Sequence, residues 1–222
     1  MTIASPIAIV GGTGPQGKGL AFRFALHHHD VTIGSRDPER AQQIAAELTA
    51  QLPQGSAVRG AVNAQAVEQA AVVVVAVPFD GQASTLADLP DISDKIVISC
   101  ANPLTFGPSG PRPLAVAEGS AAEQVAAVTG ARKVAASFHH VSASHLITTR
   151  SDAEVNNQTV LVAGDDNDAV DTTLALANAV STIGGLHVGP LAYARELEAF
   201  TAVLIAINRR HKAHSGVRIS GL

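Results

Sequence analysis

The sequence predicts an α/β fold, a Rossmann-type doubly wound parallel sheet with a small C-terminal lobe. A short β-branched strand at Ile7–Val10 leads directly into a glycine cluster and then a helix. Strand-like apolar segments go on alternating with segments of helical periodicity, which is the order of a parallel sheet with crossover helices. The chain is 46% hydrophobic but only 3% aromatic, as expected for buried parallel strands covered by Ala-rich helices.

The first half of the chain contains most of the alternation. We expect strands at residues 7–10, 31–34, 58–62, 72–77 and 95–99. We expect helices at about residues 15–28, from 37 until the Pro53 and Gly55 breakers, from 63, and at 82–89. The run Val72–Val77 is apolar on both faces and should lie at the sheet centre. Asp37-Pro38-Glu39 indicates a helix start, with a capping Asp and a proline at the first helical position.

The segment Asn102–Pro113 interrupts this alternation. It holds four prolines and two glycines, so we expect a loop. The segment follows a central strand, and open α/β sheets bind ligands beyond the carboxyl ends of their strands. A helix at about residues 120–128 and a strand at 133–138 are expected after it.

The regular alternation ends at His139. We therefore divide the chain into a dinucleotide-binding Rossmann domain at residues 1–139 and a smaller lobe at 140–222 that closes the cleft. The lobe should hold strands at 159–163 and 186–188 and helices at 168–183 and 192–212. The last helix carries an apolar stripe, which makes a homodimer the expected assembly. The stripe consists of Leu197, Phe200, Val203, Leu204 and Ile207.

Composition excludes several classes of protein. The formal net charge is -4, whereas nucleic-acid-binding domains are usually basic with a clustered patch. The single cysteine, Cys100, allows no intramolecular disulfide and fits a reducing compartment. The longest obvious apolar run, residues 70–77, is far shorter than the roughly 20 residues of a membrane helix. The N-terminus also lacks the regions of a signal peptide. We expect a soluble cytoplasmic protein with no nucleic-acid or membrane partner.

The glycine cluster fits the pattern G-x-G-x-x-G with Gly12, Gly14 and Gly17. The first glycine allows a sharp turn, the second lets the backbone approach a pyrophosphate, and the third lets the helix pack on the sheet. The helix that starts here points unpaired N–H groups at the ligand. The predicted cofactor-binding loop is Gly12, Thr13, Gly14, Pro15, Gln16 and Gly17.

The end of the second strand selects the dinucleotide. NAD-binding proteins tend to have an acidic residue there that holds the ribose 2′-OH, but this chain has Ser35-Arg36, with Arg40 one helical turn later. A guanidinium matches phosphate oxygens, and the Ser35 hydroxyl can donate a further hydrogen bond. With the Thr13 hydroxyl in the loop, these residues predict NADP rather than NAD. The alternative is that both arginines are solvated helix-start charges, partly neutralised by nearby acids.

No acid–base pair, nucleophile motif or metal cluster stands out, so we name no catalytic residue and no metal ligand. The side chains of His27, His28 and His29 would point in different directions from a helix end, which disfavours a metal site. Cys100 has no base motif and is interpreted as packing. His139 follows a predicted strand on the ligand side, where packing and ligand contact are equally good interpretations.

Several of these motifs together resemble the NADP-dependent coenzyme F420 oxidoreductases. The similarity covers nearly the whole chain. It is carried by Ile9-Val10-Gly11-Gly12-Thr13-Gly14, Gly17-Lys18-Gly19, Ile33-Gly34-Ser35-Arg36, Val77-Pro78-Phe79, Ala121-Ala122-Glu123, Gly164-Asp165-Asp166, and Gly189-Pro190-Leu191 with Arg195. The resemblance implies a Rossmann domain plus a small lobe, with NADP and coenzyme F420 meeting in the cleft between them.

The resemblance also implies roles for individual residues. The NADP 2′-phosphate would be held by Thr13, Ser35, Arg36 and Arg40; the nicotinamide side would be bordered by Val77 and Pro78, with the Ala143 backbone at the carboxamide. The F420 pocket would be lined by Asn102, Pro103, Leu104, His139 and Val141. The anionic F420 tail would meet Arg195, with Arg209, Arg210 and Lys212 as further candidates. For the last three, a cationic helix C-terminus is an equally good interpretation.

The reaction implied is reversible hydride transfer between C4 of NADPH and C5 of the deazaflavin, ring to ring and without a protein acid or base. Two alternatives stay open. One is an NADP-dependent dehydrogenase of a small carbonyl or imino substrate, in which His139 could serve as the acid–base residue. The other is a non-enzymatic NADP(H) redox sensor, which would need no second ligand pocket.

Overall fold

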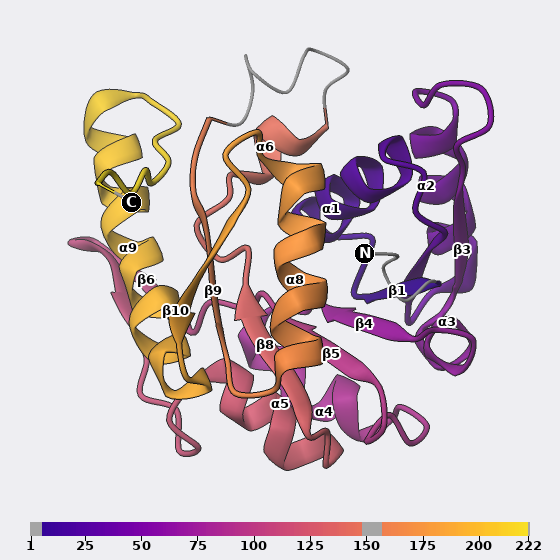
Figure 1. The fold of residues 1–222 in the computed structure, drawn as a ribbon, viewed down its shortest axis with the longest axis horizontal. Coiled ribbons are helices and arrows are strands. Elements are labelled where there is room, and N and C mark those ends of the chain that lie inside the picture. Colours follow the sequence, from indigo (N-terminus) through magenta and orange to yellow (C-terminus); the bar gives the residue numbers. More distant parts are fainter. Residues whose placement is uncertain (1–5, 148–156, 222) are drawn as a thin grey trace.

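The computed structural model describes residues 6–147 and 157–221. Eight strands form one sheet, in the order β10-β9-β8-β5-β4-β1-β2-β3 (Figure 1). Their bounds are β1 (Ile7–Val10), β2 (Val31–Ser35), β3 (Val58–Val62), β4 (Val72–Val75), β5 (Ile96–Ser99), β8 (Lys133–Ser137), β9 (Val160–Gly164) and β10 (Gly185–Gly189). The expected α/β Rossmann-type fold with a mostly parallel sheet is confirmed.

Helices cover both faces of the sheet. They are α1 (Pro15–Leu26), α2 (Pro38–Thr49), α3 (Asn63–Glu68), α4 (Phe79–Ala87), α5 (Ala121–Thr129), α6 (Ala143–Leu146), α8 (Asn167–Val180), the 3₁₀ turn η1 (Leu191–Tyr193) and α9 (Ala194–His211). None of these described helices has the length and hydropathy needed to cross a lipid bilayer.

The strand period of two divides the core between the two faces. In β1, Ile7 and Ile9 pack with α1, α2 and α8, whereas Ala8 and Val10 pack with α3, α4 and α5. The central strand β4 is buried at every position, as its unbroken valine run predicts. A small cluster that includes Ala194 joins α9 to α5, β8 and β9.

The predicted loop at Asn102–Pro113 is wrong in one respect, because it contains a separate antiparallel hairpin. Its strands are β6 (Leu104–Gly107) and β7 (Gly110–Pro113). A ribbon of two strands has only edge positions, so prolines that cannot donate a ladder hydrogen bond are tolerated in it. Gly110, at φ +102, lies in the left-handed region that the turn requires.

The sheet also departs from a fully parallel arrangement. Strand β9 pairs antiparallel with β8, with Ala136 opposite Ala163, and β10 then pairs parallel with β9. Strand direction depends on the path of the connection, which the apolar pattern does not encode. Since β8 and β9 are hydrogen-bonded, the proposed boundary at His139 falls within one continuous sheet.

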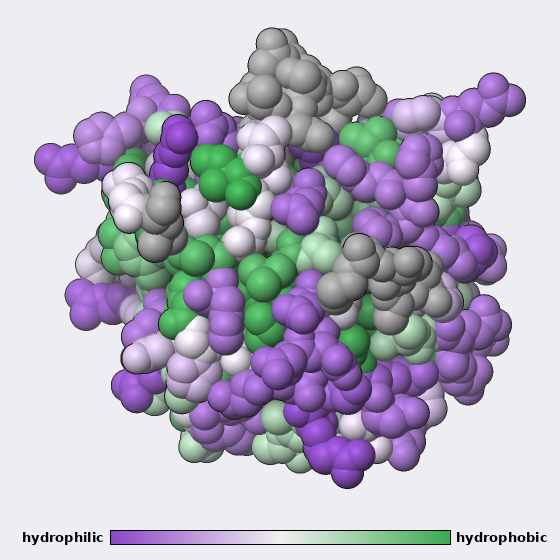
Figure 2. All heavy atoms as spheres, in the orientation of Figure 1, coloured by the Kyte–Doolittle hydropathy of each residue, from purple (hydrophilic) through white to green (hydrophobic). Residues whose placement is uncertain are grey.

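The predicted stripe on α9 is only partly buried. Leu204 is 6% exposed, but Phe200, Val203 and Ile207 are 38%, 49% and 38% exposed. Hydrophobic residues gather near the middle of the face drawn in Figure 2, between hydrophilic margins. The outer side of α9 therefore has apolar side chains that the described part of this chain does not cover.

Candidate functional site

The crevice at the carboxyl edge of the sheet lies where the connections change face. Strand β1 leads into α1 on one face, and its neighbour β4 leads into α4 on the other. Such switch points are where open α/β sheets bind ligands. A hollow of about 490 Å³ opens there, and we call it the first hollow. It is lined by Gly11, Thr13, Gly14, Ser35, Arg36, Asp37, Arg40, Asn63, Val77, Pro78, Gly81 and Thr85.

The glycine loop forms one wall of the first hollow. A Cβ atom on Gly12 would lie 2.6 Å from Ile33 Cβ, whereas one on Gly14 would meet only the Gly11 carbonyl, at 3.5 Å. Gly12 is therefore required for packing, and Gly14 leaves its space open to a ligand. Gly14 is also the N-cap of α1 and provides no side-chain cap, so the first-turn N–H groups remain available to an anion.

Two arginines line the wall of the first hollow opposite the glycine loop. Arg36 and Arg40 are exposed and form no ion pair with any residue in the described ranges. The Asp37 carboxylate accepts a hydrogen bond from the Arg40 backbone N–H at 3.1 Å, and so caps α2. The Ser35 hydroxyl oxygen accepts from the Asp37 N–H at 3.1 Å. Asp37 therefore stabilises the helix start, and no ion pair joins it to either guanidinium in the described ranges.

The sequence prediction missed Asn63, at the end of β3. Its Oδ1 accepts a hydrogen bond from the Gly11 N–H at 3.4 Å. A Cβ on Gly34 would lie 2.6 Å from the same oxygen, so the amide is wedged between the ends of β1 and β2. Asn63 follows a weak strand and belongs to no motif, so only its position at the start of a helix was visible in the sequence.

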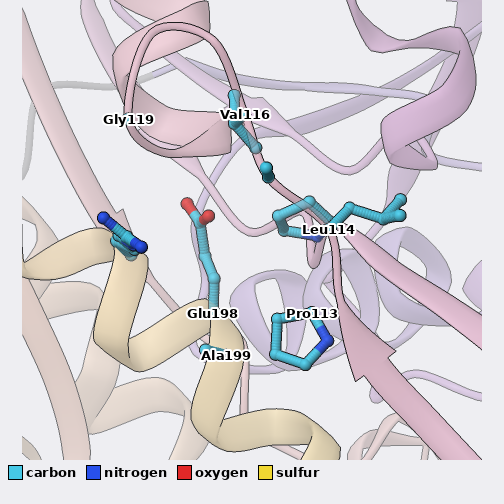
Figure 3. A pocket seen from close by; sticks show the side chains of 9 residues that line it. Pro113, Leu114, Val116, Gly119, Glu198 and Ala199 are labelled. Carbon is cyan, nitrogen blue, oxygen red and sulfur yellow. The ribbon is translucent and has the colours of Figure 1, made fainter.

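A second hollow, of about 550 Å³, lies between the loop after β5, the segment after β7 and the first turns of α9 (Figure 3). It is lined by Pro103, Pro113, Leu114, Ala115, Val116, Gly119, Arg195, Glu198 and Ala199. Of the predicted F420-contacting residues, only Pro103 and Arg195 line it. Strands β4 and β5 are hydrogen-bonded neighbours, so the residues that follow them, Val77-Pro78 and Pro103, border adjacent parts of the edge.

The other predicted F420 contacts do not line the second hollow. Asn102 Nδ2 donates a hydrogen bond to the His139 carbonyl oxygen at 3.2 Å. His139 and Val141 are buried, and Leu104 is half-buried in β6. Ala143, predicted to meet the nicotinamide, begins α6 and lines neither hollow.

Comparisons with known proteins decide the family. A family model described as "NADP oxidoreductase coenzyme F420-dependent" matches residues 6–103. The F420-dependent NADP reductase of Methanothermobacter thermautotrophicus is 37% identical over 97% of this chain and 95% of its own length. That of Methanocaldococcus jannaschii is 34% identical over 97% of this chain and 98% of its own length. The chain belongs to the F420-dependent NADP oxidoreductase family. The resemblance drawn from the sequence motifs is thus confirmed.

A solved structure of a family candidate supports the same assignment. The protein, from Arthrobacter sp. FB24, is described as a candidate F420-dependent NADP reductase. It matches this chain with a TM-score of 0.77 at 26% identity, over 99% of this chain and 100% of that one. The structural match therefore covers nearly the whole chain, including the part after residue 103 that the family model does not match.

His139 is a buried neutral imidazole in this family member. It is 4% exposed, and neither ring nitrogen has a hydrogen-bond partner among the described residues. Burial, and secondarily the neighbouring His140, lower the pKa of His139 to about 3. An uncharged ring with unpaired polar atoms is compatible with both earlier interpretations, packing and ligand contact.

Glu198 is a buried carboxylate that the sequence prediction also missed. It is 1% exposed and accepts hydrogen bonds from the backbone N–H groups of Ala121 and Ala122. Burial raises the pKa of Glu198 to about 7, although the two N–H donors oppose the shift. Ala194, four residues earlier, is also buried, so Glu198 lies on the inner face of α9. The predicted apolar stripe included neither residue, so it did not reveal this face.

Cys100 behaves as a packing residue in this family member. It is buried, its thiol donates to the Val75 carbonyl oxygen at 3.1 Å, and burial raises its pKa to about 12. A thiol with such a pKa is protonated at neutral pH and a poor nucleophile.

Proposed function

We propose that the protein transfers a hydride reversibly between NADP(H) and the deazaflavin coenzyme F420. The observation that carries the proposal is the pair of hollows at the carboxyl edge, bordered by residues that follow the neighbouring strands β4 and β5. The volumes, about 490 and 550 Å³, lie in the range of small-molecule sites. Membership in a family whose relatives are named F420-dependent NADP reductases supports the same reaction.

NADP(H) is proposed to occupy the first hollow. The loop of Gly12, Thr13, Gly14, Pro15, Gln16 and Gly17 is proposed to bind the pyrophosphate, with Thr13 and Gly14 lining the hollow and Gly12 and Gly17 shaping the turn. Ser35, Arg36 and Arg40 with the Thr13 hydroxyl hold the 2′-phosphate. The two unpaired guanidinium groups fit the 2′-phosphate of NADP, a group that NAD lacks. Val77 and Pro78 border the nicotinamide, and the Ala143 backbone, which lies outside the first hollow, is proposed to meet its carboxamide.

F420 is proposed to bind with its ring beside Pro103 and its anionic tail at Arg195. Asn102, His139 and Val141, after β5 and β8, and Leu104 in β6 are proposed to support this pocket. A further hollow of about 520 Å³, lined in part by Arg209 and Arg210, lies farther along α9 and offers a path for a long tail. Lys212 at the end of α9 would extend the same cationic row.

The chain's own contribution to the reaction is positioning and the exclusion of water. When bound, the two cofactors supply a hydride donor and a hydride acceptor, and no protein acid or base is required. The apolar side chains that border the two hollows would keep water from the reacting carbons, which should approach within roughly 3–3.5 Å. The neutral His139 ring adds no charge to this region.

We also propose the larger organisation of the protein. Residues 1–139 hold the dinucleotide, and residues 140–222 close over it. The exposed apolar side chains Phe200, Val203 and Ile207 on α9 support a homodimer built on that helix. The lone reduced cysteine fits a cytoplasmic enzyme.

An absorbance assay tests the function. Purified protein is mixed with NADPH and F420, and the deazaflavin absorbance should fall as the ring is reduced. Intact NADPH binding without any absorbance change would contradict the proposal and favour a redox sensor. NADPH oxidation with a small carbonyl or imine, and none with F420, would favour the dehydrogenase alternative.

A further inference from the structure

Helix α9 presents opposite charges to the second hollow. Arg195 and Glu198 are three positions apart, a spacing at which helical side chains of opposite charge normally pair. Arg195 nevertheless forms no hydrogen bond or ion pair with any residue of the described ranges. Within that part of the chain, Arg195 is thus an unpaired cation in the wall of the second hollow, although a carboxylate lies three positions away on the same helix.

The Glu198 carboxylate is held by another helix. Its Oε2 accepts from the Ala121 N–H at 2.9 Å and its Oε1 from the Ala122 N–H at 3.1 Å. These are the first N–H groups of α5, which would otherwise have no partner. Ser120 caps the next one, by accepting from the Glu123 N–H at 3.0 Å. Figure 3 shows the Glu198 carboxylate turned toward the loop at Gly119 and away from Pro113.

The arrangement is the energetically favoured one. If Glu198 turned to Arg195, two buried N–H groups would lose their acceptor. An exposed ion pair between Glu198 and Arg195 would stabilise the fold by less than the loss of two buried hydrogen bonds would destabilise it. Arg195 is itself exposed, so water can solvate its charge until a ligand arrives.

We propose that α5 holds the Glu198 carboxylate away from Arg195 and so keeps that guanidinium available to an anionic group of the co-substrate. This inference rests on the proposed function for the identity of the co-substrate. Glu198 is assigned no part in hydride transfer.

Two matched substitutions of Glu198 separate the effect of its charge from the effect of its side-chain length. Glu198→Asp keeps the charge, but the side chain is one methylene too short to reach both N–H groups. Its carboxylate is then free to pair with Arg195. Glu198→Gln keeps the length and removes the charge. At pH 8, above the pKa of about 7, we expect Glu198→Asp to raise the KM for F420 about tenfold and Glu198→Gln to change it less than threefold.

The effect should act through Arg195. In an Arg195→Ala background, Glu198→Asp should add little further change to the KM for F420, and the KM for NADPH should stay constant throughout. Glu196→Gln is the control for charge, because Glu196 is exposed on the same turn. Equal rises in KM for Glu198→Asp and Glu198→Gln would overturn the inference, since charge would then be irrelevant.

A second measurement does not depend on F420. Phenylglyoxal modifies unpaired arginines, and mass spectrometry of the peptide that contains Arg195 gives its rate. The rate should be equal in the wild type and Glu198→Gln, and at least threefold slower in Glu198→Asp. Faster labelling in Glu198→Gln than in the wild type would overturn the inference even if Glu198→Asp does not fold. A wild type that labels as expected but never reduces F420 would contradict only the proposed function.

Discussion

Gly17 packs directly on Gly12: a Cβ atom added to Gly17 would lie 2.6 Å from the Gly12 Cα. Helix α1 therefore sits on the turn that follows β1 with no space for a side chain between them. Gly14, two positions after Gly12, faces the first hollow instead. The same motif thus contains glycines that serve the fold and one that serves the ligand.

Alanine substitutions should separate these roles. Gly17→Ala forces a methyl group against the Gly12 backbone, and overpacking of this kind costs about 1–3 kcal/mol. For a chain of this size the loss corresponds to a fall in Tm of roughly 3–10 °C, measurable by thermal unfolding. Gly14→Ala should leave the Tm within about 2 °C but weaken NADPH binding about tenfold, because the methyl group blocks the approach to the pyrophosphate. An unchanged NADPH affinity in Gly14→Ala would mean that the ligand does not lie against this loop.

Arg36→Ala should change dinucleotide selectivity. Hydrogen bonds to charged groups contribute about 1.5–3 kcal/mol, so the Kd for NADPH should rise about 10- to 100-fold. The Kd for NADH, which has no 2′-phosphate, should change less than about threefold. Fluorescence titration with both dinucleotides measures the two values. Equal losses would show that Arg36 does not recognise the phosphate.

Asn63 should prove necessary for the glycine loop. Asn63→Leu removes the acceptor of the Gly11 N–H, and we expect both the Tm and the NADPH affinity to fall. Asn63→Asp retains an acceptor oxygen, so its Tm should stay closer to that of the wild type. Its negative charge faces the first hollow and should weaken NADPH binding at least as much as the Leu variant does. Tight NADPH binding by the Asp variant would place the phosphates away from Asn63.

Because of the lowered pKa of His139, we expect the free energy of unfolding to fall in mild acid. Its folded pKa of about 3 lies below the ordinary value of 6.5, so the unfolded chain takes up a proton first as the pH falls. The contribution of His139 to the free energy of unfolding is present above pH 6.5 and is lost progressively toward pH 3. At pH 5 the linked loss is about 2 kcal/mol.

Urea unfolding at pH 7.5 and pH 5 measures this loss. Between pH 7.5 and pH 5, the His139→Leu variant should lose less of its free energy of unfolding than the wild type loses, whatever its stability at pH 7.5. The neighbouring His140, also buried and with a lowered pKa, stays in both proteins, so its own acid sensitivity is present in both. An identical loss in the variant would assign the acid sensitivity to other groups.

The part of the site that was predictable lies in local motifs at strand ends. Ser35 ends β2, Arg36 follows it, and Thr13 lies in the turn after β1, and parallel strands bring their carboxyl ends to one edge. The first hollow therefore collects the predicted phosphate-binding residues. The predicted F420 residues are more scattered, because the hairpin and α9 define the second hollow, and both are placed by long-range contacts.

The sequence by itself determined the glycine turn, the alternation of strands and helices, the cationic pair after β2 and the family. The first three are encoded by neighbours within about one helical turn or one strand, where steric and hydrogen-bonding preferences act locally. The family follows from several such local motifs along the chain. Only the tertiary structure decided the antiparallel direction of β9, the wedge of Asn63 and the capture of Glu198 by α5. The last two depend on buried polar groups finding partners distant in the chain, which is a property of the packed fold and not of any segment.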